Sequence, residues 1–312
     1  PDETLFHIHR LLGDAEWRQR FTHLGYRRVM TQHTYRHRLA TIVRALGLDV
    51  GLGTDPCVSV VTILRARADL DAAIRNYQAQ VYAPREWVLV LQGDELRAAD
   101  VERGVAELPD VRIWTRPAQE SPGACLNFAV EQCRGRYVAV FDPAHHYGAH
   151  YLVDMLLPFR FAGAGVVGKA CVYSHRADRN ATVLHGRGRE QVDVECIHPG
   201  TVMADADVVR KIRFETGPEE PCVRFVAACR RQGVGIYAAD RYNFVAGGRD
   251  PRAAQAADEL GAPEEVGSGL RLDLAMLADD SGAPCVERVP TLAEPVPEAV
   301  TALQPLPARP PP

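Results

Sequence analysis

The chain has 312 residues, which is enough for one large domain or two small ones. A hydrophobic content of 46% beside 24% charged residues is ordinary for a protein that buries a core, and the net charge of −4 gives no general reason to expect nucleic-acid or membrane binding. The eight cysteines form no C-x-x-C pair, which disfavours a structural zinc site or a redox motif. No apolar stretch approaches the roughly 20 residues of a transmembrane segment, and the first residues lack the features of a signal peptide, so we expect a cytoplasmic protein.

Residues 1–50 are predicted to form a helical extension. Apolar residues recur there at helical spacing, first at Leu5, Ile8, Leu11 and Leu12 and later at Leu39, Ile42, Val43 and Leu46. Gly25 and Gly47 are predicted helix ends.

Residues 57–249 alternate short apolar runs with amphipathic segments. The predicted strands are Val58–Leu64, Trp87–Leu91, Val111–Trp114, Tyr137–Phe141, Gly165–Val167 and Gly235–Ala238. The predicted helices cover about 68–80, 97–107, 123–134, 149–162, 205–212 and 222–232. This alternation indicates an α/β fold with a mainly parallel sheet and helices on both faces. Residues 250–312 are rich in Pro and Ala and are predicted to be a tail, with one short helix near 270–277.

Polar side chains follow three of the predicted strands. Arg65 follows the first strand, Gln92 and Asp94 follow the second, and Asp142 ends the fourth. Ligands of such sheets bind outside the carboxyl ends of the strands, so these residues could hold a nucleotide. They could equally be ordinary solvated loop residues. The chain has neither G-x-G-x-x-G nor a P-loop motif, which disfavours a dinucleotide-binding or P-loop fold.

A collinear series of segments carries a resemblance to a known family. The series reads LVLQG at 89–93, GACLNFA at 123–129, DPAHHYGAHYLVDM at 142–155, GAGVVGK at 163–169 and GVGIYAADRYNFV at 233–245. With these segments the run from Val58 to about Val245 resembles family 2 glycosyltransferases of the GT-A fold. Residues 11–38 are similar to the C-terminal helices of spore-envelope-type glycosyltransferases of the GT-B fold, which implies an adjacent transferase domain.

The resemblance implies an inverting transfer of a sugar from a nucleotide-diphosphate sugar to an acceptor that the sequence does not identify. It implies nucleotide contacts from Gln92, Asp94 and Asn127, and Arg65 and Lys169 could supply cationic contacts to the diphosphate. A divalent cation, Mn²⁺ or Mg²⁺, would lie near Asp142. Asp142 together with His145 or His146 could also hold a softer cation such as Mn²⁺ or Zn²⁺ through an imidazole nitrogen. Glu219 or Glu220 would act as the general base.

Two departures from the family pattern weaken the catalytic prediction. Ala144 stands where the family has the second carboxylate of its Asp-x-Asp motif, and alanine cannot bind a metal. Pro221 and Cys222 stand where the family has its acidic pair. An inactive transferase fold that serves as a binding or assembly module therefore remains an alternative, as does a nucleotidyltransferase on a related sheet. For the two histidines the alternative is a pair of exposed loop residues, and for Glu219 and Glu220 it is a pair of acids that stabilise a helix N-terminus.

Overall fold

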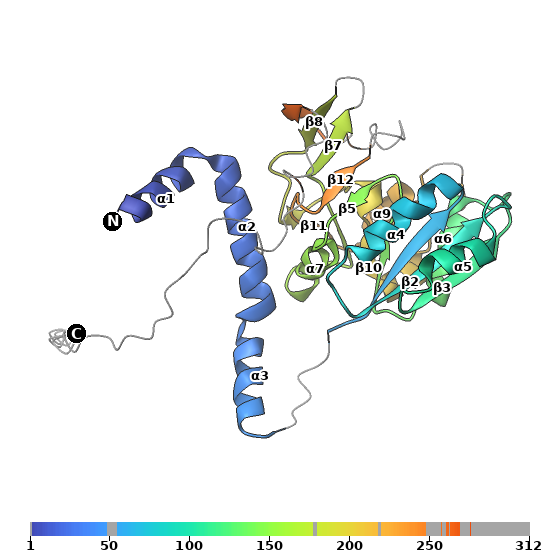
Figure 1. Ribbon diagram of the computed structural model, residues 1–312, viewed down its shortest axis with the longest axis horizontal. Helices are drawn as coiled ribbons and strands as arrows, with labels where there is room; N and C mark the ends of the chain where they lie inside the picture. Colours follow the sequence, from blue (N-terminus) through green and yellow to red (C-terminus); the bar gives the residue numbers. More distant parts are fainter. Residues whose placement is uncertain are drawn as a thin grey trace, which may run out of the picture. The chain divides into compact units, whose positions relative to one another are not determined.

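The computed structural model describes residues 2–48, 55–176, 180–217, 220–247, 257, 260, 261, 263–268 and 275. Its N-terminal part forms the helices α1 (Asp2–Gly13), α2 (Ala15–Gln32) and α3 (Tyr35–Ala45) (Figure 1). Asp14 starts α2, because its carboxylate accepts a hydrogen bond from the backbone N–H of Trp17 at 2.9 Å. Below, these three helices are called the N-terminal arm.

One of the two predicted helix ends in the arm is correct. Gly47 follows α3 with a φ of +65°, a backbone conformation that glycine adopts without strain. Gly25 lies inside α2, so the prediction of a helix end there was wrong. A single glycine costs a helix only about 1 kcal/mol relative to alanine, too little to end a helix of 18 residues that also contacts the rest of the protein.

The larger sheet contains all six predicted strands. Its order is β3 (Val111–Arg116), β2 (Arg85–Gln92), β1 (Val58–Leu64), β4 (Tyr137–Val140), β10 (Met203–Asp205), β6 (Val166–Gly168), β11 (Ile236–Ala238) and β9 (Val192–Asp193). The first four strands are parallel, and β6 is parallel to β11. The sequence did not predict the short strands β9 and β10. Strand β10 pairs antiparallel with β4 and β6, and β9 pairs antiparallel with β11.

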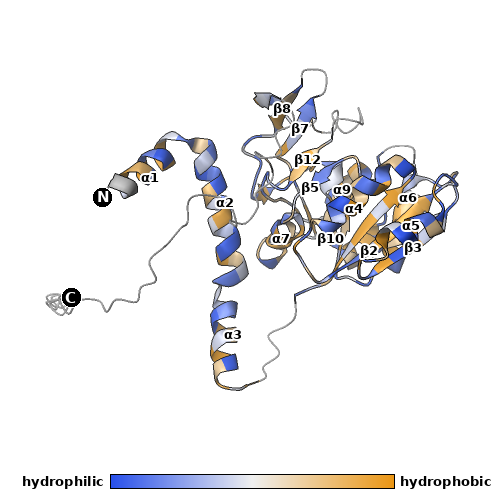
Figure 2. Cartoon of the chain, in the orientation of Figure 1, coloured by the Kyte–Doolittle hydropathy of each residue, from blue (hydrophilic) through white to orange (hydrophobic). Residues whose placement is uncertain are grey.

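Helices cover both faces of this sheet, as predicted. Successive side chains of a strand point to opposite faces, so Val60 and Leu89 belong to one apolar core while Val61 and Val88 belong to the other. The first core is closed by α4 (Leu70–Gln78), α5 (Ala98–Val105) and α7 (Tyr151–Leu156). The second is closed by α6 (Pro122–Gln132), α8 (Ala206–Ile212) and α9 (Pro221–Arg231). Figure 2 shows the resulting contrast between apolar strands and mixed helices.

A smaller sheet was not predicted. Its order is β13 (Glu264–Ser268), β8 (Ala181–His185), β7 (Val172–Arg176), β12 (Phe244–Ala246) and β5 (His146–Tyr147). Strand β13 lies within the predicted tail, so the sheet extends beyond the predicted domain end at residue 249. Apart from residue 275, the predicted helix near 270–277 lies outside the described residues. None of the described helices combines the length and apolar character that crossing a bilayer requires.

Candidate functional site

The order of the strands points to one edge of the larger sheet as a ligand site. The chain runs outward from β1 to β2 and β3 and then returns to β4 on the other side of β1. In open α/β sheets, ligands bind outside the carboxyl ends of the strands where the order reverses in this way. Here that position lies between the ends of β1 and β4, which Arg65 and Asp142 follow.

The structure brings Arg65 and Gln92 together at this edge. Nε of Arg65 donates a hydrogen bond to Oε1 of Gln92 at 2.8 Å, and Nε2 of Gln92 donates to the backbone oxygen of Glu120 at 2.5 Å. Gly93 turns the chain with a φ of +91°, and the exposed Asp94 follows it. The three predicted residues therefore line one segment of the strand edge, with the guanidinium held by a neutral partner.

Asp142 is exposed and held by a tight turn. Its Oδ1 accepts a hydrogen bond from the backbone N–H of Ala144 at 2.8 Å, and its own N–H donates to the hydroxyl of Tyr147 at 3.0 Å. That hydroxyl donates in turn to the backbone oxygen of Gly200 at 2.6 Å, and the ring stacks on Phe141 with 4.0 Å between centroids. Tyr147 thus positions Asp142. The sequence placed it in the family's motif but did not indicate this role.

The predicted histidines lie in different surroundings. The ring of His145 is buried beside His198 and Phe244, and its Nδ1 accepts a hydrogen bond from the N–H of Gly247 at 3.1 Å. His146 is exposed, and partial burial of its ring together with the charge of Arg75 lowers its pKa, which favours the neutral imidazole.

Asp142, His145 and His146 do not form a cluster of three metal-binding groups among the described residues. Of the three, His145 is the one whose ring lies buried in the protein. Protein sites often hold Mg²⁺ through one or two carboxylates together with the phosphates of a substrate, and Asp142 is the carboxylate of the three.

Glu220 stands at the start of α9. It is the N-cap residue, and its Oε1 accepts a hydrogen bond from the N–H of Cys222 at 3.4 Å. Burial raises the pKa of the Cys222 thiol well above its ordinary value, and the carboxylates of Glu220 and Asp142 raise it further. The charges of both carboxylates thus act on the same thiol. Glu219 lies outside the described residues.

Two predicted ligand contacts have partners inside the protein instead. Asn127 is buried, and its side-chain amide makes two hydrogen bonds to the backbone of Phe214. Nδ2 of Asn127 donates to the carbonyl oxygen of Phe214 at 2.8 Å, and the N–H of Phe214 donates to Oδ1 of Asn127 at 2.9 Å. Lys169 is fully buried, and its ammonium donates to the backbone oxygen of Asp240 at 2.9 Å and to Oδ1 at 3.2 Å. Both residues thus hold the protein together. An ammonium with no exposed surface does not reach a diphosphate, so Lys169 does not serve as a phosphate contact in this structure.

A cluster of metal-binding residue types lies where the N-terminal arm meets the α/β domain. His23, Asp154 and Asp240 are buried, and one donor atom from each lies within 4.8 Å of the others. Arg27 already bonds both carboxylate oxygens of Asp154, and Lys169 bonds Asp240. Because two cationic groups already balance the two carboxylates, a metal ion would be repelled, and we interpret the cluster as a structural ion network.

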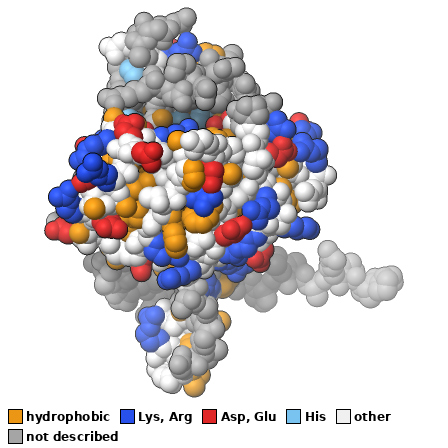
Figure 3. All heavy atoms as spheres, turned by 90° about the vertical axis from the view of Figure 1, so that its right-hand side faces the viewer, with side chains coloured by type: hydrophobic (Ala, Val, Ile, Leu, Met, Phe, Trp, Pro, Cys, Tyr) orange, Lys and Arg blue, Asp and Glu red, His pale blue; other side chains and the backbone are white. Residues whose placement is uncertain are grey.

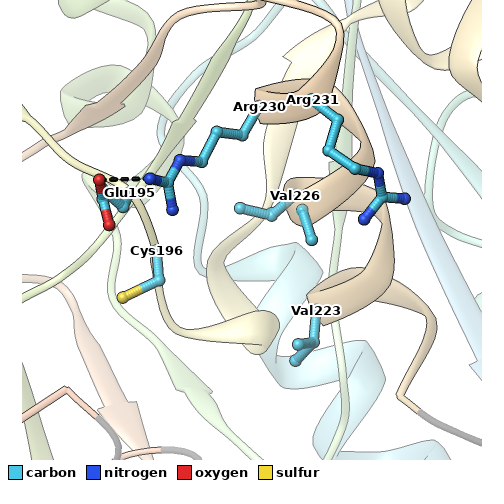
Figure 4. Close-up of a pocket in the computed structure, with 7 residues that line it drawn as sticks. Glu195, Cys196, Val223, Val226, Arg230 and Arg231 are labelled. Carbon is cyan, nitrogen blue, oxygen red and sulfur yellow. Dashed lines mark hydrogen bonds and ion pairs between the residues drawn. The ribbon is translucent and has the colours of Figure 1, made fainter.

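A surface pocket of about 500 Å³ lies against one side of α9 (Figure 4). It is lined by Glu195, Cys196, Val223, Val226, Ala227, Arg230 and Arg231, and the guanidinium of Arg230 pairs with Glu195 across it. None of the predicted site residues that the structure describes lines this pocket. The pocket is therefore separate from the strand edge.

The sequence matches no protein-family model and no curated protein. In structure, the chain is similar to S. aureus TarS, residues 1-349, crystallised in complex with UDP-GlcNAc. The identity is 13%, the alignment covers 64% of this chain and 61% of that chain, and the TM-score is 0.50. Mannosyltransferase PcManGT from Pyrobaculum calidifontis, in complex with GDP-Man and Mn²⁺, aligns with 14% identity over 77% of this chain and 68% of that chain, with a TM-score of 0.49.

The likeness to TarS shows that the chain has a glycosyltransferase fold. At 13% identity it shows the fold alone. The chain spans 61% of the length of that TarS structure, so activity, substrates and partners are matters of proposal.

Proposed function

We propose that the protein is a glycosyltransferase whose nucleotide-sugar donor binds at the strand edge between β1 and β4. The observation that carries the proposal is the arrangement of a guanidinium, Arg65, and a carboxylate, Asp142, directly after the two strands between which the strand order reverses. The fold shared with TarS, whose crystal structure holds UDP-GlcNAc, supports a nucleotide-sugar donor.

In this proposal Arg65 binds the donor diphosphate directly, and Asp142 binds it through a cation. A guanidinium is suited to phosphate oxygens, and the hydrogen bond to Gln92 restricts where that of Arg65 can point. Asp142 would hold a divalent cation, which when bound neutralises charge on the leaving diphosphate. The turn around Asp142 and the hydroxyl of Tyr147 keep the carboxylate at the strand end without a ligand-induced rearrangement.

The acceptor would be activated by a carboxylate of the α9 start. Glu220 is exposed at the N-cap of α9, and in this proposal it accepts the proton of an acceptor hydroxyl as the new glycosidic bond forms. Attack from the side opposite the diphosphate would invert the anomeric centre. Glu219 remains a second candidate for the same role.

A second candidate function is that of a binding or assembly module without catalysis. The observation that favours it is Ala144, which leaves Asp142 without the second carboxylate of an Asp-x-Asp motif. A domain of this kind would retain nucleotide-sugar binding or lose it, but in either case would not cleave the donor.

Titration calorimetry with UDP-, GDP- and TDP-sugars, with and without Mn²⁺, tests the proposal. We expect one nucleotide to bind more tightly with Mn²⁺, and we expect Asp142→Ala to lose that gain while Asp207→Ala does not. Asp207 is the matched control, because its carboxylate is 92% exposed at the start of α8. Failure of every donor to bind would overturn the donor site.

Turnover separates the two candidate functions. Slow hydrolysis of the bound donor that falls in Glu220→Gln supports the enzyme with this base. Binding without hydrolysis in the unaltered protein supports the module.

A further inference from the structure

The positive charge of the N-terminal arm is set apart from the rest of the protein. From Trp17 to Leu48 the chain has seven arginines and no Asp or Glu, although the whole protein has a net charge of −4. One of the seven, Arg27, is buried against Asp154, so the surface charge comes from the other six. Elsewhere acidic and basic side chains alternate, as on the face of the α/β domain shown in Figure 3. A segregated charge of this kind is the electrostatic pattern of a surface that meets an anionic partner.

An exposed apolar stripe runs along α3 within the same segment. It consists of Tyr35, Leu39, Ile42 and Leu46, which are 87%, 49%, 56% and 65% exposed. Their spacing of four, three and four residues places them on one side of a helix, and none of the residues of α3 is buried. Below, these four residues are called the α3 stripe.

Helix α3 has little to stabilise it in water. Isolated helices shorter than about 12 residues are marginal, and α3 has 11. The capping box at Thr34 and His37 contributes a local hydrogen bond, but much of the apolar surface of the stripe stays exposed. A surface that covered the stripe would therefore stabilise the helix as well as bind it.

The arginines of α3 stand at the borders of the stripe and opposite it. At 100° per residue, Arg36 and Arg38 lie on either side of the stripe and Arg44 lies on the far side. The guanidinium carbon of Arg38 is 5.8 Å from the centre of the Tyr35 ring, which fits a place at the border. Long side chains in such positions can reach outward to anionic groups while the apolar side chains between them are buried.

We propose that α3 binds the surface of an anionic lipid bilayer, with the α3 stripe at the boundary between headgroups and acyl chains and the arginines among the headgroups. A bilayer surface offers apolar and anionic contacts together along the length of a helix. The phosphates of a nucleic acid would pair with the arginines but would leave the α3 stripe exposed to water. A second copy of the arm would place arginines against arginines.

The binding would hold the α/β domain close to the membrane. Helix α2 follows α1 and leads directly to α3, and its His23 and Arg27 are bonded to Asp154 in the domain. The inference does not depend on the proposed function, because vesicle binding needs neither a nucleotide nor a metal.

Vesicle flotation of the full chain tests the proposal. We expect binding to vesicles of phosphatidylcholine mixed with phosphatidylglycerol, weaker binding to phosphatidylcholine alone, and a loss of the difference at high salt. Leu39→Glu with Ile42→Glu should weaken binding roughly tenfold or more, since it places charge in the stripe. The matched control is Val81→Glu, at a valine that is 53% exposed outside the arm and should bind like the unaltered protein.

A second variant keeps the test independent of helix stability. Arg38→Gln with Arg44→Gln retains good helix formers and leaves the stripe intact, and it should weaken binding to the anionic vesicles alone. Arg103→Gln, at a guanidinium that is 78% exposed in the α/β domain, is its control. Equal binding to both kinds of vesicle, or undiminished binding of the stripe variant, would overturn the proposal. Light scattering could also show a dimer that dissociates to monomers in the stripe variant. That result would assign the stripe to contacts with a second copy and would overturn the membrane proposal.

Discussion

Arg27 of α2 donates two hydrogen bonds to the carboxylate of Asp154 in α7, from Nε to Oδ1 at 2.7 Å and from Nη2 to Oδ2 at 2.8 Å. Both side chains are buried, and the two residues are 127 positions apart in the sequence. Asn243 and His23 also bond Asp154, so the carboxylate is the centre of the contact between the N-terminal arm and the α/β domain.

Arg27→Met should loosen this contact. Removing one partner of a buried ion pair leaves the other charge without compensation, which costs about 3–5 kcal/mol. Hydrogen exchange of the α2 amides measures the loss as a lower free energy of local opening. Arg103→Met removes an exposed guanidinium and should change stability by less than about 0.5 kcal/mol. Equal protection of α2 in both variants would show that the ion pair does not hold the arm.

The contact should also weaken as the pH rises. Burial opposes a charge on His23, but the carboxylates of Asp240 and Asp154 outweigh burial and the charge of Arg27 and raise the pKa of the imidazole above 6.5. Lys169 faces the same cluster through Asp240. A pKa raised by folding contributes stability that is complete below pH 6.5 and is lost as the pH rises through the folded-state value.

Amide protection of α2 should therefore fall between pH 6.5 and more alkaline conditions. In His23→Gln that pH dependence should disappear. A variant that kept the full dependence would place the titrating group elsewhere.

Gly123→Ala should destabilise the start of α6. A Cβ at this position would overlap the carbonyl oxygen of Glu215 and lie 2.9 Å from its carbonyl carbon, so backbone has to move. We expect a loss of about 1–3 kcal/mol in urea unfolding. Gly104→Ala is the matched control, because a Cβ there meets Ile74 at an ordinary 3.5 Å and alanine favours the helix by up to about 1 kcal/mol. A loss at position 104 as large as at 123 would contradict the steric explanation.

Glu86→Gln should destabilise the sheet at neutral pH. Oε1 of Glu86 accepts hydrogen bonds from the hydroxyl of Ser59 and the N–H of Arg134, and Oε2 accepts from Arg112 at 2.5 Å. Burial alone would raise the pKa of Glu86, but these bonds lower it below 4.5. Glutamine offers one acceptor oxygen to several donors, and we expect a loss of about 1–3 kcal/mol.

The effect of Glu86→Gln should depend on pH in one direction. A lowered pKa contributes stability above pH 4.5 that is lost as the pH falls through the folded-state value. Urea midpoints of the two proteins should therefore approach each other in acid. A constant difference would mean that the charge of Glu86 is not involved.

Tyr147→Phe tests the positioning of Asp142. The hydroxyl bonds both the N–H of Asp142 and the oxygen of Gly200, so its removal should cost about 1–3 kcal/mol of stability. If Asp142 holds a cation as proposed, the variant should also lose part of the gain in nucleotide affinity that Mn²⁺ provides. Tyr137→Phe, at another buried tyrosine of the same core, should leave that gain unchanged. An unchanged Mn²⁺ effect in Tyr147→Phe would separate the hydroxyl from the metal site.

The sequence predicted the parts of the fold that have local patterns. The strand Val58–Leu64 is an apolar run buried on both faces, which is the pattern of a central parallel strand. Strands β9, β10 and β12 have two or three residues each, too few for a period of two to stand out. Their positions depend on partners far away in the chain.

The sequence predicted which residues lie at the strand ends, but it did not predict which partners their side chains and those of Asn127 and Lys169 would bond. Arg65, Gln92 and Asp142 follow strands that the sequence located correctly, so their common edge followed from topology. Asn127 and Lys169 have side chains that can bind a nucleotide, but their partners Phe214 and Asp240 are 87 and 71 residues away. Nothing local in the sequence distinguishes an amide that binds a ligand from one that binds distant backbone.

The bonds of Glu16 have a consequence for the order in which the protein forms. This carboxylate of α2 contacts Arg241 across 225 residues and accepts a hydrogen bond from the hydroxyl of Tyr173 at 2.9 Å. At about 5–20 residues per second, a ribosome reaches Arg241 tens of seconds after it has synthesised Glu16. During that interval α2 has emerged, but Tyr173 and Arg241, which bond Glu16, have not yet been synthesised. Until then, α2 lacks the ion pairs that hold it to the α/β domain.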